Sequence, residues 1–170
     1  MTCLQLRAGV GLLHMSEANS SGQSPDVVVR GAANGFRQEV ESGSHRFTAD
    51  EPTDVGGTDA APGPYEYLLA ALGACTSMTV GLYARTRKWP LEDVQVSLRH
   101  ARIHSKDCAE CETKEGMLHR IELQVQLTGD LTAEQRAKLM EIAHKCPVHR
   151  TLKGEIDIRI SAGDGATAAP

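Results

Sequence analysis

The chain has 170 residues, a formal net charge of −4 and five cysteines. This length is typical of a single domain. The mildly acidic balance, with basic residues scattered along the chain, excludes the concentrated positive charge of proteins that bind nucleic acid or anionic membranes. We therefore expect neither partner. Five cysteines in a chain without a strongly basic leader segment favour the cytoplasm, where thiols are kept reduced.

Composition divides the sequence into three parts. Residues 1–25 join a short apolar patch to Ser, Asn, Gly and Gln residues, which predicts a flexible N-terminal arm, and Met15 within it is an alternative start. Residues 26–162 carry the periodic patterns expected of the folded domain. Residues 163–170 are rich in Gly and Ala and predict a flexible C-terminal tail.

The folded part opens with β patterns. Alternating or β-branched runs predict short antiparallel strands over residues 27–32, 36–41 and 45–49. The pair Asn34-Gly35 fits a hairpin turn between the first two. Residues 50–62 are rich in Gly, Asp, Thr and Pro and predict a loop.

A long apolar helix is predicted over residues 63–88. Its larger apolar residues recur at three- and four-residue steps, and no charged side chain occurs from Tyr67 to Ala84. A run of this length lies at the edge of what spans a bilayer, but its Gly, Ser and Thr residues favour a buried central helix instead. One small sheet covers only one face of such a helix, so we expect a homodimer.

The second half of the domain predicts a long antiparallel hairpin followed by helix. Alternating strands at residues 91–104 and 117–127 flank a polar loop at 105–116. Thr132 and Gln135 form the pattern of a capping box at the start of a helix.

The last elements are short. Cys146-Pro147 ends that helix and begins another turn or two of helix to residue 152, and the alternation in residues 155–160 predicts a closing strand. The order of elements indicates an α+β fold with antiparallel sheet and segregated helices.

Two cysteines occupy positions suited to thiol chemistry. Cys75 lies on the apolar side of the long helix among small neighbours, and Cys146 precedes Pro147 at a helix start, where free N–H groups favour a thiolate. A peroxidatic thiol must be a reachable thiolate, and a second thiol must then attack the sulfenic acid. Two buried structural cysteines are the alternative.

The segments PYEYLLAALGACTSMTV and KCPVHRTL resemble the OsmC/Ohr family of thiol-dependent hydroperoxide reductases. The resemblance covers about residues 38–160 and includes HRFTADEP and Gly56-Gly57. It implies the OsmC-like fold, with antiparallel sheets wrapped around a long central helix in an intertwined homodimer. It also implies reduction of organic hydroperoxides by Cys75 and Cys146 in oxidative-stress defence, with a dithiol as reductant.

The resemblance also implies an activating pair, a glutamate ten residues before the reactive cysteine and an arginine. The place of the glutamate holds Tyr65 here, so Glu66 is its nearest candidate, and Arg37 or Arg30 is the nearest candidate for the arginine. If they do not pair, the alternative is a non-catalytic protein that binds a small apolar ligand.

The apolar face of the long helix suits an alkyl chain. Our candidate substrate-binding residues are Tyr65, Leu69, Leu72 and His149, and His149 is also placed to act as a base beside Cys146.

A second cysteine cluster suggests a metal. His104, Cys108 and Cys111 have the ligand types and spacing of a zinc site, and His119 or Glu110 is a candidate fourth ligand. A redox-active dithiol is the alternative, and either would make the protein a metal or redox sensor. Apart from this zinc we expect no cofactor.

Overall fold

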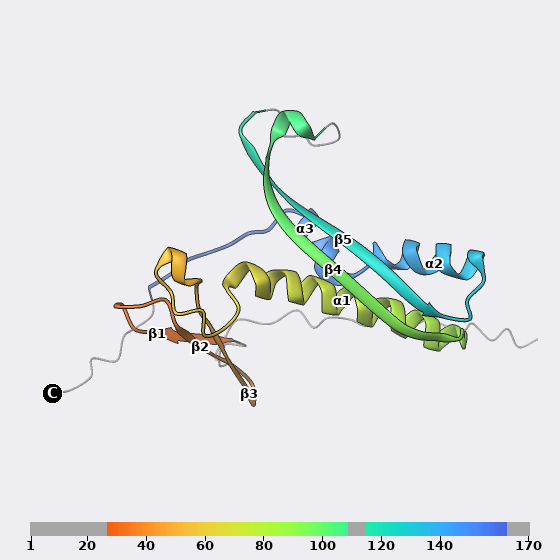
Figure 1. Cartoon of the computed structure of the whole chain (residues 1–170), viewed down its shortest axis with the longest axis horizontal. Helices are drawn as coiled ribbons and strands as arrows, with labels where there is room; N and C mark the ends of the chain where they lie inside the picture. The colour runs from red at the N-terminus through yellow and green to blue at the C-terminus, as the bar shows by residue number, and fades with distance from the viewer. Residues whose placement is uncertain (1–26, 109–114, 163–170) are drawn as a thin grey trace, which may run out of the picture.

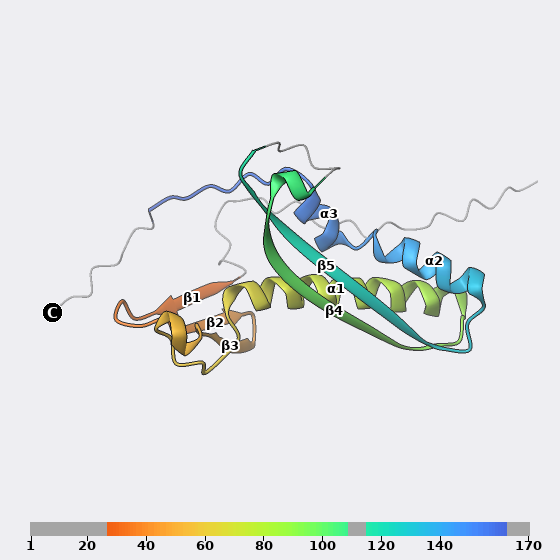
Figure 2. The same ribbon diagram turned by 45° about the horizontal axis from the view of Figure 1, so that its top comes forward.

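The computed structural model describes residues 27–108 and 115–162. The predicted arm at 1–25 and tail at 163–170 lie outside these residues. A long helix, α1 (Pro64–Arg87), runs through the middle of the structure. A three-stranded sheet lies at its N-terminal end, and a long hairpin crosses its body (Figures 1 and 2). This is the α+β arrangement, with antiparallel sheets around a central helix, that the sequence predicts.

The first sheet consists of β1 (Val28–Gly31), β2 (Gln38–Ser42) and β3 (His45–Ala49), in that order and antiparallel. Val40 on the middle strand is buried at 7% exposure. The three predicted strands are therefore confirmed, each to within two residues at either end. The cross-strand neighbours of Val40 are Val29 and Phe47, which are 56% and 40% exposed, so this face is only partly covered, and the buried Ala49 ends the sheet against the loop that leads to α1.

The loop over residues 50–62 is ordered by one buried carboxylate. Asp50 is 2% exposed and accepts hydrogen bonds from the backbone N–H of Glu51 at 2.9 Å, of Thr58 at 3.0 Å and of Ala60 at 3.2 Å. The Thr58 hydroxyl donates a further bond. This hydroxyl and the N–H donors lower the pKa of Asp50 to about 2. The loop thereby fixes the point at which α1 begins.

We predict that Asp50→Asn loosens this loop, because the amide nitrogen cannot accept the bonds that the carboxylate accepts. The melting temperature at pH 7 should fall by about 4–8 °C. The folded-state pKa lies below the ordinary 3.8, so the carboxylate stabilises the fold above pH 3.8 and loses this effect as the pH falls toward 2.

The two proteins should therefore differ less at pH 3 than at pH 7 in thermal unfolding followed by circular dichroism. Asp59→Asn, in the same loop, is the matched control and should melt like the wild type. Equal melting temperatures at pH 7 for Asp50→Asn and wild type would contradict this role.

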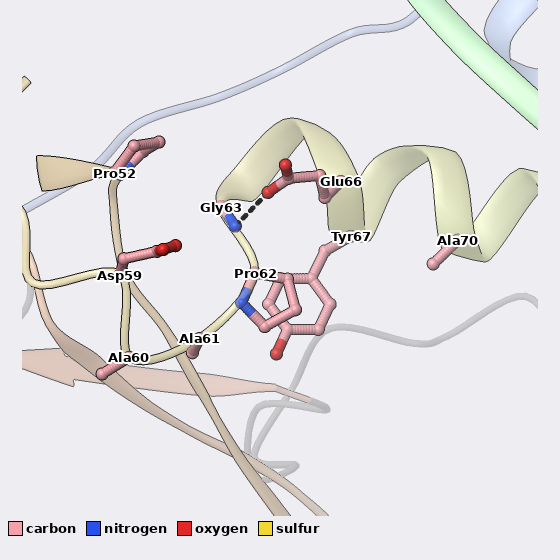
Figure 3. Close-up of a pocket in the computed structure, with 9 residues that line it drawn as sticks. All are labelled: Pro52, Asp59, Ala60, Ala61, Pro62, Gly63, Glu66, Tyr67 and Ala70. Carbon is pink, nitrogen blue, oxygen red and sulfur yellow. Dashed lines mark hydrogen bonds between the residues drawn. The ribbon is translucent and has the colours of Figure 1, made fainter. Parts of the chain in front are cut away.

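The start of α1 uses local hydrogen bonds. The Glu66 carboxylate accepts from the N–H of Gly63, the residue that caps the helix (Figure 3). Pro64 occupies the first helical position. The helix is long and apolar enough to cross a membrane by length and composition alone, with 28% of the apolar stretch buried in this chain. One such helix is weak support for a span, because the core helix of a soluble protein passes the same test.

The hairpin packs directly on α1. Its strands β4 (Leu91–His104) and β5 (Met117–Gly129) pair antiparallel, with Leu98 opposite Leu123. Gly73 of α1 is buried, and a Cβ atom there would lie 2.7 Å from the Leu98 side chain. A larger residue at this position, two residues from Cys75, would force the end of the Leu98 side chain to move.

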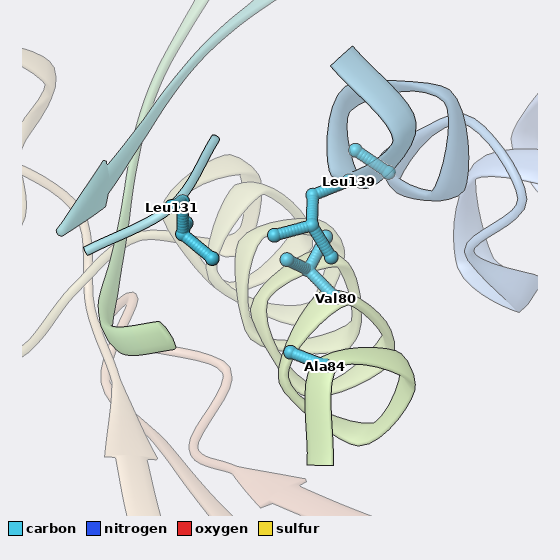
Figure 4. Packing of buried hydrophobic residues seen from close by; sticks show 5 residues of the cluster. Val80, Ala84, Leu131 and Leu139 are labelled. Atoms are coloured by element: carbon cyan, nitrogen blue, oxygen red, sulfur yellow. The ribbon is translucent and has the colours of Figure 1, made fainter. Parts of the chain in front are cut away.

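The hydrophobic core forms where α2 (Ala133–Ala143) packs on the C-terminal half of α1 (Figure 4). Its centre contains the fully buried side chains of Val80 and Leu139, joined by other buried residues at Ala84, Leu131 and Ala143. The predicted capping box is confirmed, since Thr132 Oγ1 accepts from the Gln135 N–H at 3.2 Å and the Gln135 side chain accepts from the Thr132 N–H at 2.9 Å.

The predicted closing strand at residues 155–160 is wrong for the single chain. After α3 (Pro147–Lys153), this segment forms no strand, and it pairs with no strand among the described residues. Ile156, Ile158 and Ile160 are 49%, 78% and 96% exposed. The alternating pattern specifies which side chains share a face, but a strand also needs a partner, and residues 27–108 and 115–162 supply none for this segment.

Candidate functional site

The structure brings Cys75 and Cys146 together. Cys75 lies in the middle of α1, and Cys146 is the residue that caps the N-terminus of α3, which packs against α1. The two thiols form a side-chain hydrogen bond with each other. Cys146 is 0% exposed, whereas Cys75 is partly exposed. Of the two residues, Cys75 is therefore the more accessible to a small molecule.

The negative charge of the pair is stabilised on Cys146. Burial alone would raise the pKa of this thiol, but several hydrogen bonds to its sulfur lower it. The donors are the Cys75 thiol, the backbone N–H of His149 and of Val148, and the Thr76 hydroxyl. Of the two thiols, Cys146 is therefore the one that ionises more readily.

The pKa of Cys75 is shifted in the opposite direction. Burial raises the pKa of its thiol, and so does the hydrogen bond it makes with Cys146. The backbone N–H of Val148 and the Thr79 hydroxyl act against this rise. The opposite shifts have one cause, since a single proton held between two close sulfurs favours ionisation of one and opposes ionisation of the other.

Thr76 is a site residue that sequence reasoning missed. It is 1% exposed, and its hydroxyl donates to the Leu72 carbonyl at 2.8 Å as well as lying within reach of the Cys146 sulfur. A hydroxyl has one hydrogen, so it serves either the helix backbone or the thiolate. The only sequence signal is a hydroxyl residue next to Cys75 in an apolar stretch.

His149 lies on the first turn of α3, half-buried beside Cys146. Its ring centroid is 5.8 Å from that of His144. Burial lowers the pKa of His149, and the nearby His144 and Lys153 lower it further. The imidazole is therefore held in its neutral form, which is the form that accepts a proton.

The candidate activating residues do not reach the thiols. Glu66 bonds to Gly63, and it lies nine residues before Cys75 on the same helix, a rise of about 13–14 Å. Arg37 is exposed in the connection between β1 and β2. Neither takes part in an ion pair within the described residues. Within one chain, the donors around Cys146 are the groups that favour a thiolate.

The candidate substrate-binding residues divide into two groups. Leu72 and His149 line one cleft of about 320 Å³ between the hairpin, α1 and α3. Tyr65 is instead 53% exposed and stacks on His100, with ring centroids 4.6 Å apart. Leu69 is half-buried on α1 and lines none of the described clefts.

A larger pocket, of about 490 Å³, lies at the N-terminal end of α1 between the helix and the loop over residues 50–62 (Figure 3). Its lining contains Glu66 and Tyr67 but neither thiol. The Tyr67 hydroxyl donates to the Thr48 carbonyl, so it joins α1 to the first sheet. We place the candidate site at the thiols because no cysteine lines this larger pocket.

The predicted zinc site falls partly outside the described residues. Cys111 and Glu110 lie there. His104 is the last residue of β4, and Cys108 follows four residues later. His104 Nδ1 accepts from the Lys106 N–H at 3.5 Å. His119 is occupied elsewhere, because its Nδ1 lies 2.8 Å from His100 Nε2 in a hydrogen bond. The zinc site stays a prediction.

Residues 57–161 match the family model described as OsmC-like protein. The chain belongs to the OsmC family. The match spans both thiols and all the elements from α1 to the segment after α3. No curated protein matches the chain in sequence.

Solved structures share this OsmC fold. An organic hydroperoxide resistance protein OsmC from Legionella pneumophila is 25% identical, with a TM-score of 0.55 over 77% of this chain and 90% of that one. An OsmC-like protein from Mycoplasma pneumoniae is 20% identical, with a TM-score of 0.60 over 78% and 89%. The organic hydroperoxide resistance protein OhrB of Bacillus subtilis is 20% identical, with a TM-score of 0.52 over 77% and 91%.

Proposed function

We propose that this OsmC protein is a thiol peroxidase that reduces organic hydroperoxides through Cys75 and Cys146. The observation that carries the proposal is the contact between a partly exposed thiol and a fully buried one, with their hydrogen bond in place before any oxidation. Family membership and the hydroperoxide resistance proteins among its structural neighbours support the same chemistry. A role in oxidative-stress defence follows from it.

Exposure decides which sulfur meets the peroxide. Cys75 is the reachable thiol, so it attacks the O–O bond of the hydroperoxide, becomes a sulfenic acid and releases the alcohol. Before attack its proton must leave, and the hydrogen bond to Cys146 provides the path, with the Cys146 sulfur as acceptor. The alkoxide leaving group takes up the proton that Cys146 received from Cys75, which gives the alcohol and leaves Cys146 as a thiolate.

The second half of the cycle uses Cys146. Its sulfur attacks the sulfenic sulfur of Cys75, the S–S bond forms, and the hydroxyl group leaves with a proton as water. One hydroperoxide is thus reduced to alcohol and water, and two thiols are oxidised to one disulfide. An external dithiol must then reduce that disulfide to restore the pair.

The active molecule is proposed to be a homodimer. The single chain leaves apolar side chains exposed on α1, with Met78 at 71% and Leu82 at 50%. The isoleucines of residues 155–160 are exposed as well. A second copy is the occupant we propose for both surfaces, because an unpaired alternating segment and an uncovered helix in one chain fit an intertwined assembly.

The test is a single-turnover reaction. We expect that reduced protein mixed with one equivalent of cumene hydroperoxide releases one equivalent of cumyl alcohol and forms a Cys75–Cys146 disulfide, identified by peptide mass spectrometry. The disulfide should be absent from Cys75→Ser. Thiols that stay reduced in excess hydroperoxide would overturn the peroxidase.

That outcome would favour the second candidate, a protein that binds a small apolar ligand and uses the thiols structurally. One observation favours this alternative, namely that Glu66 and Arg37 are not paired in the chain. A binding protein would hold an apolar ligand with thiols that stay inert toward hydroperoxides.

A further inference from the structure

Two threonine hydroxyls of α1 lie against the two sulfurs. The Thr76 hydroxyl is within hydrogen-bond reach of the Cys146 sulfur, and it donates to the Leu72 carbonyl at 2.8 Å. The Thr79 hydroxyl is within reach of the Cys75 sulfur, and it donates to the backbone carbonyl of the same residue at 2.7 Å. Each sulfur therefore has its own threonine, and each threonine also has a helix carbonyl to bond.

The charge on a sulfur decides which of the two partners the hydroxyl prefers. A hydroxyl has a single hydrogen, so it donates to the carbonyl or to the sulfur. A neutral thiol is a weak acceptor, and the carbonyl is then the better partner. A thiolate is a stronger acceptor, because hydrogen bonds to ionised groups are roughly twice as strong as neutral ones. The direction of each hydroxyl therefore follows the ionisation of its own sulfur.

The singly ionised pair has two arrangements of its proton. The negative charge favours Cys146, whose pKa is lowered, over Cys75, whose pKa is raised. Attack on a hydroperoxide by Cys75 needs the other arrangement, in which this thiol has passed its proton to Cys146. A donor to the Cys146 sulfur favours the first arrangement, and a donor to the Cys75 sulfur favours the second.

We propose that Thr79 is a positioning residue for the reactive thiol, and that its hydroxyl turns from the helix carbonyl to the Cys75 sulfur when this thiol gives up its proton. Thr76 does the same for Cys146, so the two threonines act in opposite directions. Each keeps its own proton throughout. As a statement about catalysis, this rests on the peroxidase function proposed above, but the hydrogen bonds themselves do not depend on turnover.

The other groups around the sulfurs do not change with the position of the charge. The N–H of Val148 acts on both sulfurs, and the helix backbone fixes its direction. His149 is the titratable side chain that α3 places beside the pair. Its pKa is lowered from 6.5, so it is neutral over the pH range in which thiols ionise. The threonine hydroxyls are the donors that can turn.

The first test needs no peroxide. The rate at which iodoacetamide alkylates Cys75, followed by peptide mass spectrometry, reports how much of this residue is thiolate. Thr79→Val keeps the shape of the side chain and removes the hydroxyl, so it should slow this alkylation about tenfold at pH 7, the effect of losing a hydrogen bond to a charged group. Thr79→Ser keeps a hydroxyl and should restore the wild-type rate.

Thr86→Val is the matched control. The Thr86 hydroxyl also donates to the carbonyl four residues earlier, that of Leu82 at 2.9 Å, but it lies seven residues beyond Thr79, a rise of about 10 Å along the same helix. The variant removes the same kind of helix bond and should leave the alkylation of Cys75 unchanged. If Thr79→Val melts below the assay temperature, Thr79→Ala provides the same test.

The second test uses the opposite role of Thr76. Thr76→Val should shift the appearance of thiolate absorbance to higher pH, because Cys146 ionises more readily than Cys75 and would lose a donor. Where the pair is singly ionised, less of the charge then stays on Cys146, and Cys75 should be alkylated up to about tenfold faster than in the wild type. Thr79→Val should leave the absorbance titration nearly unchanged.

An unchanged alkylation rate in Thr79→Val would overturn the proposal. A slow rate that Thr79→Ser does not restore would indicate a packing effect and would overturn it as well, as would slower alkylation of Cys75 in Thr76→Val. Thiols that are inert toward cumene hydroperoxide, in a protein whose alkylation depends on Thr79 as described, would overturn the peroxidase and leave the role of the threonine standing. The two proposals therefore fail separately.

Discussion

Cys75→Ser is expected to slow the consumption of organic hydroperoxide by a factor on the order of 10³ or more, because removing a catalytic nucleophile leaves only binding and positioning effects. The serine hydroxyl does not ionise near neutral pH and cannot replace the sulfur in attack on an O–O bond. The measurement is steady-state turnover of cumene hydroperoxide with dithiothreitol as the dithiol. Cys3→Ser, in the predicted N-terminal arm, is the cysteine-matched control and should turn over like the wild type.

Cys146→Ser should behave differently from Cys75→Ser. The exposed thiol is still present, so one equivalent of alcohol should appear in a first turnover, and the Cys75 sulfenic acid should then persist for lack of a resolving thiol. Trapping with dimedone and mass spectrometry would detect it. Full multiple turnover by Cys146→Ser would contradict the role of the buried thiol.

The largest structural effect is expected from the segment after α3. Light scattering with size-exclusion chromatography should give twice the 18.3 kDa mass of one chain. Replacing Ile158 and Ile160 with Asp should abolish that species, because both side chains lie on the apolar face of a segment that pairs with no strand in the described part of the chain. Since intertwined protomers often have no stable folded monomer, the double variant should lose its cooperative thermal transition.

The alternation of the segment provides the control. Asp157 and Arg159 lie on its other face and pair with each other at 2.7–2.8 Å in this chain. Arg159→Gln should therefore keep the dimer. A wild-type protein that elutes as a monomer with a normal melting temperature would contradict the dimer, and so would a double variant that stays dimeric.

The sequence was informative wherever a pattern is local. The three- and four-residue spacing from Tyr65 to Tyr83 predicted α1, and the Thr132 and Gln135 pair predicted where α2 begins. The two long strands were also correct, because alternation over more than ten residues leaves one antiparallel register that buries one face. The error at residues 155–160 had a single cause, since a strand is defined by a partner that the local pattern does not contain.

The site depended on information that spacing does not carry. Cys75 and Cys146 are far apart in the sequence, and only the family resemblance suggested that they meet. The lowered pKa of Cys146 could be predicted in part, because a helix begins directly after this residue. The hydrogen bond from the Thr76 hydroxyl could not, because it depends on how α1 packs against α3. Glu66 was one residue away from the place that the count predicts, and its carboxylate bonds to Gly63.

The single proton held between Cys75 and Cys146 also sets how strongly acidity influences the thermodynamics of reduction. Where Cys146 is ionised and Cys75 is not, oxidising the pair releases one proton for every two electrons. The midpoint potential then falls by about 30 mV for each unit rise in pH, half the dependence of a pair in which both thiols are protonated. The midpoint potential of such a pair therefore changes less when the pH of its surroundings changes.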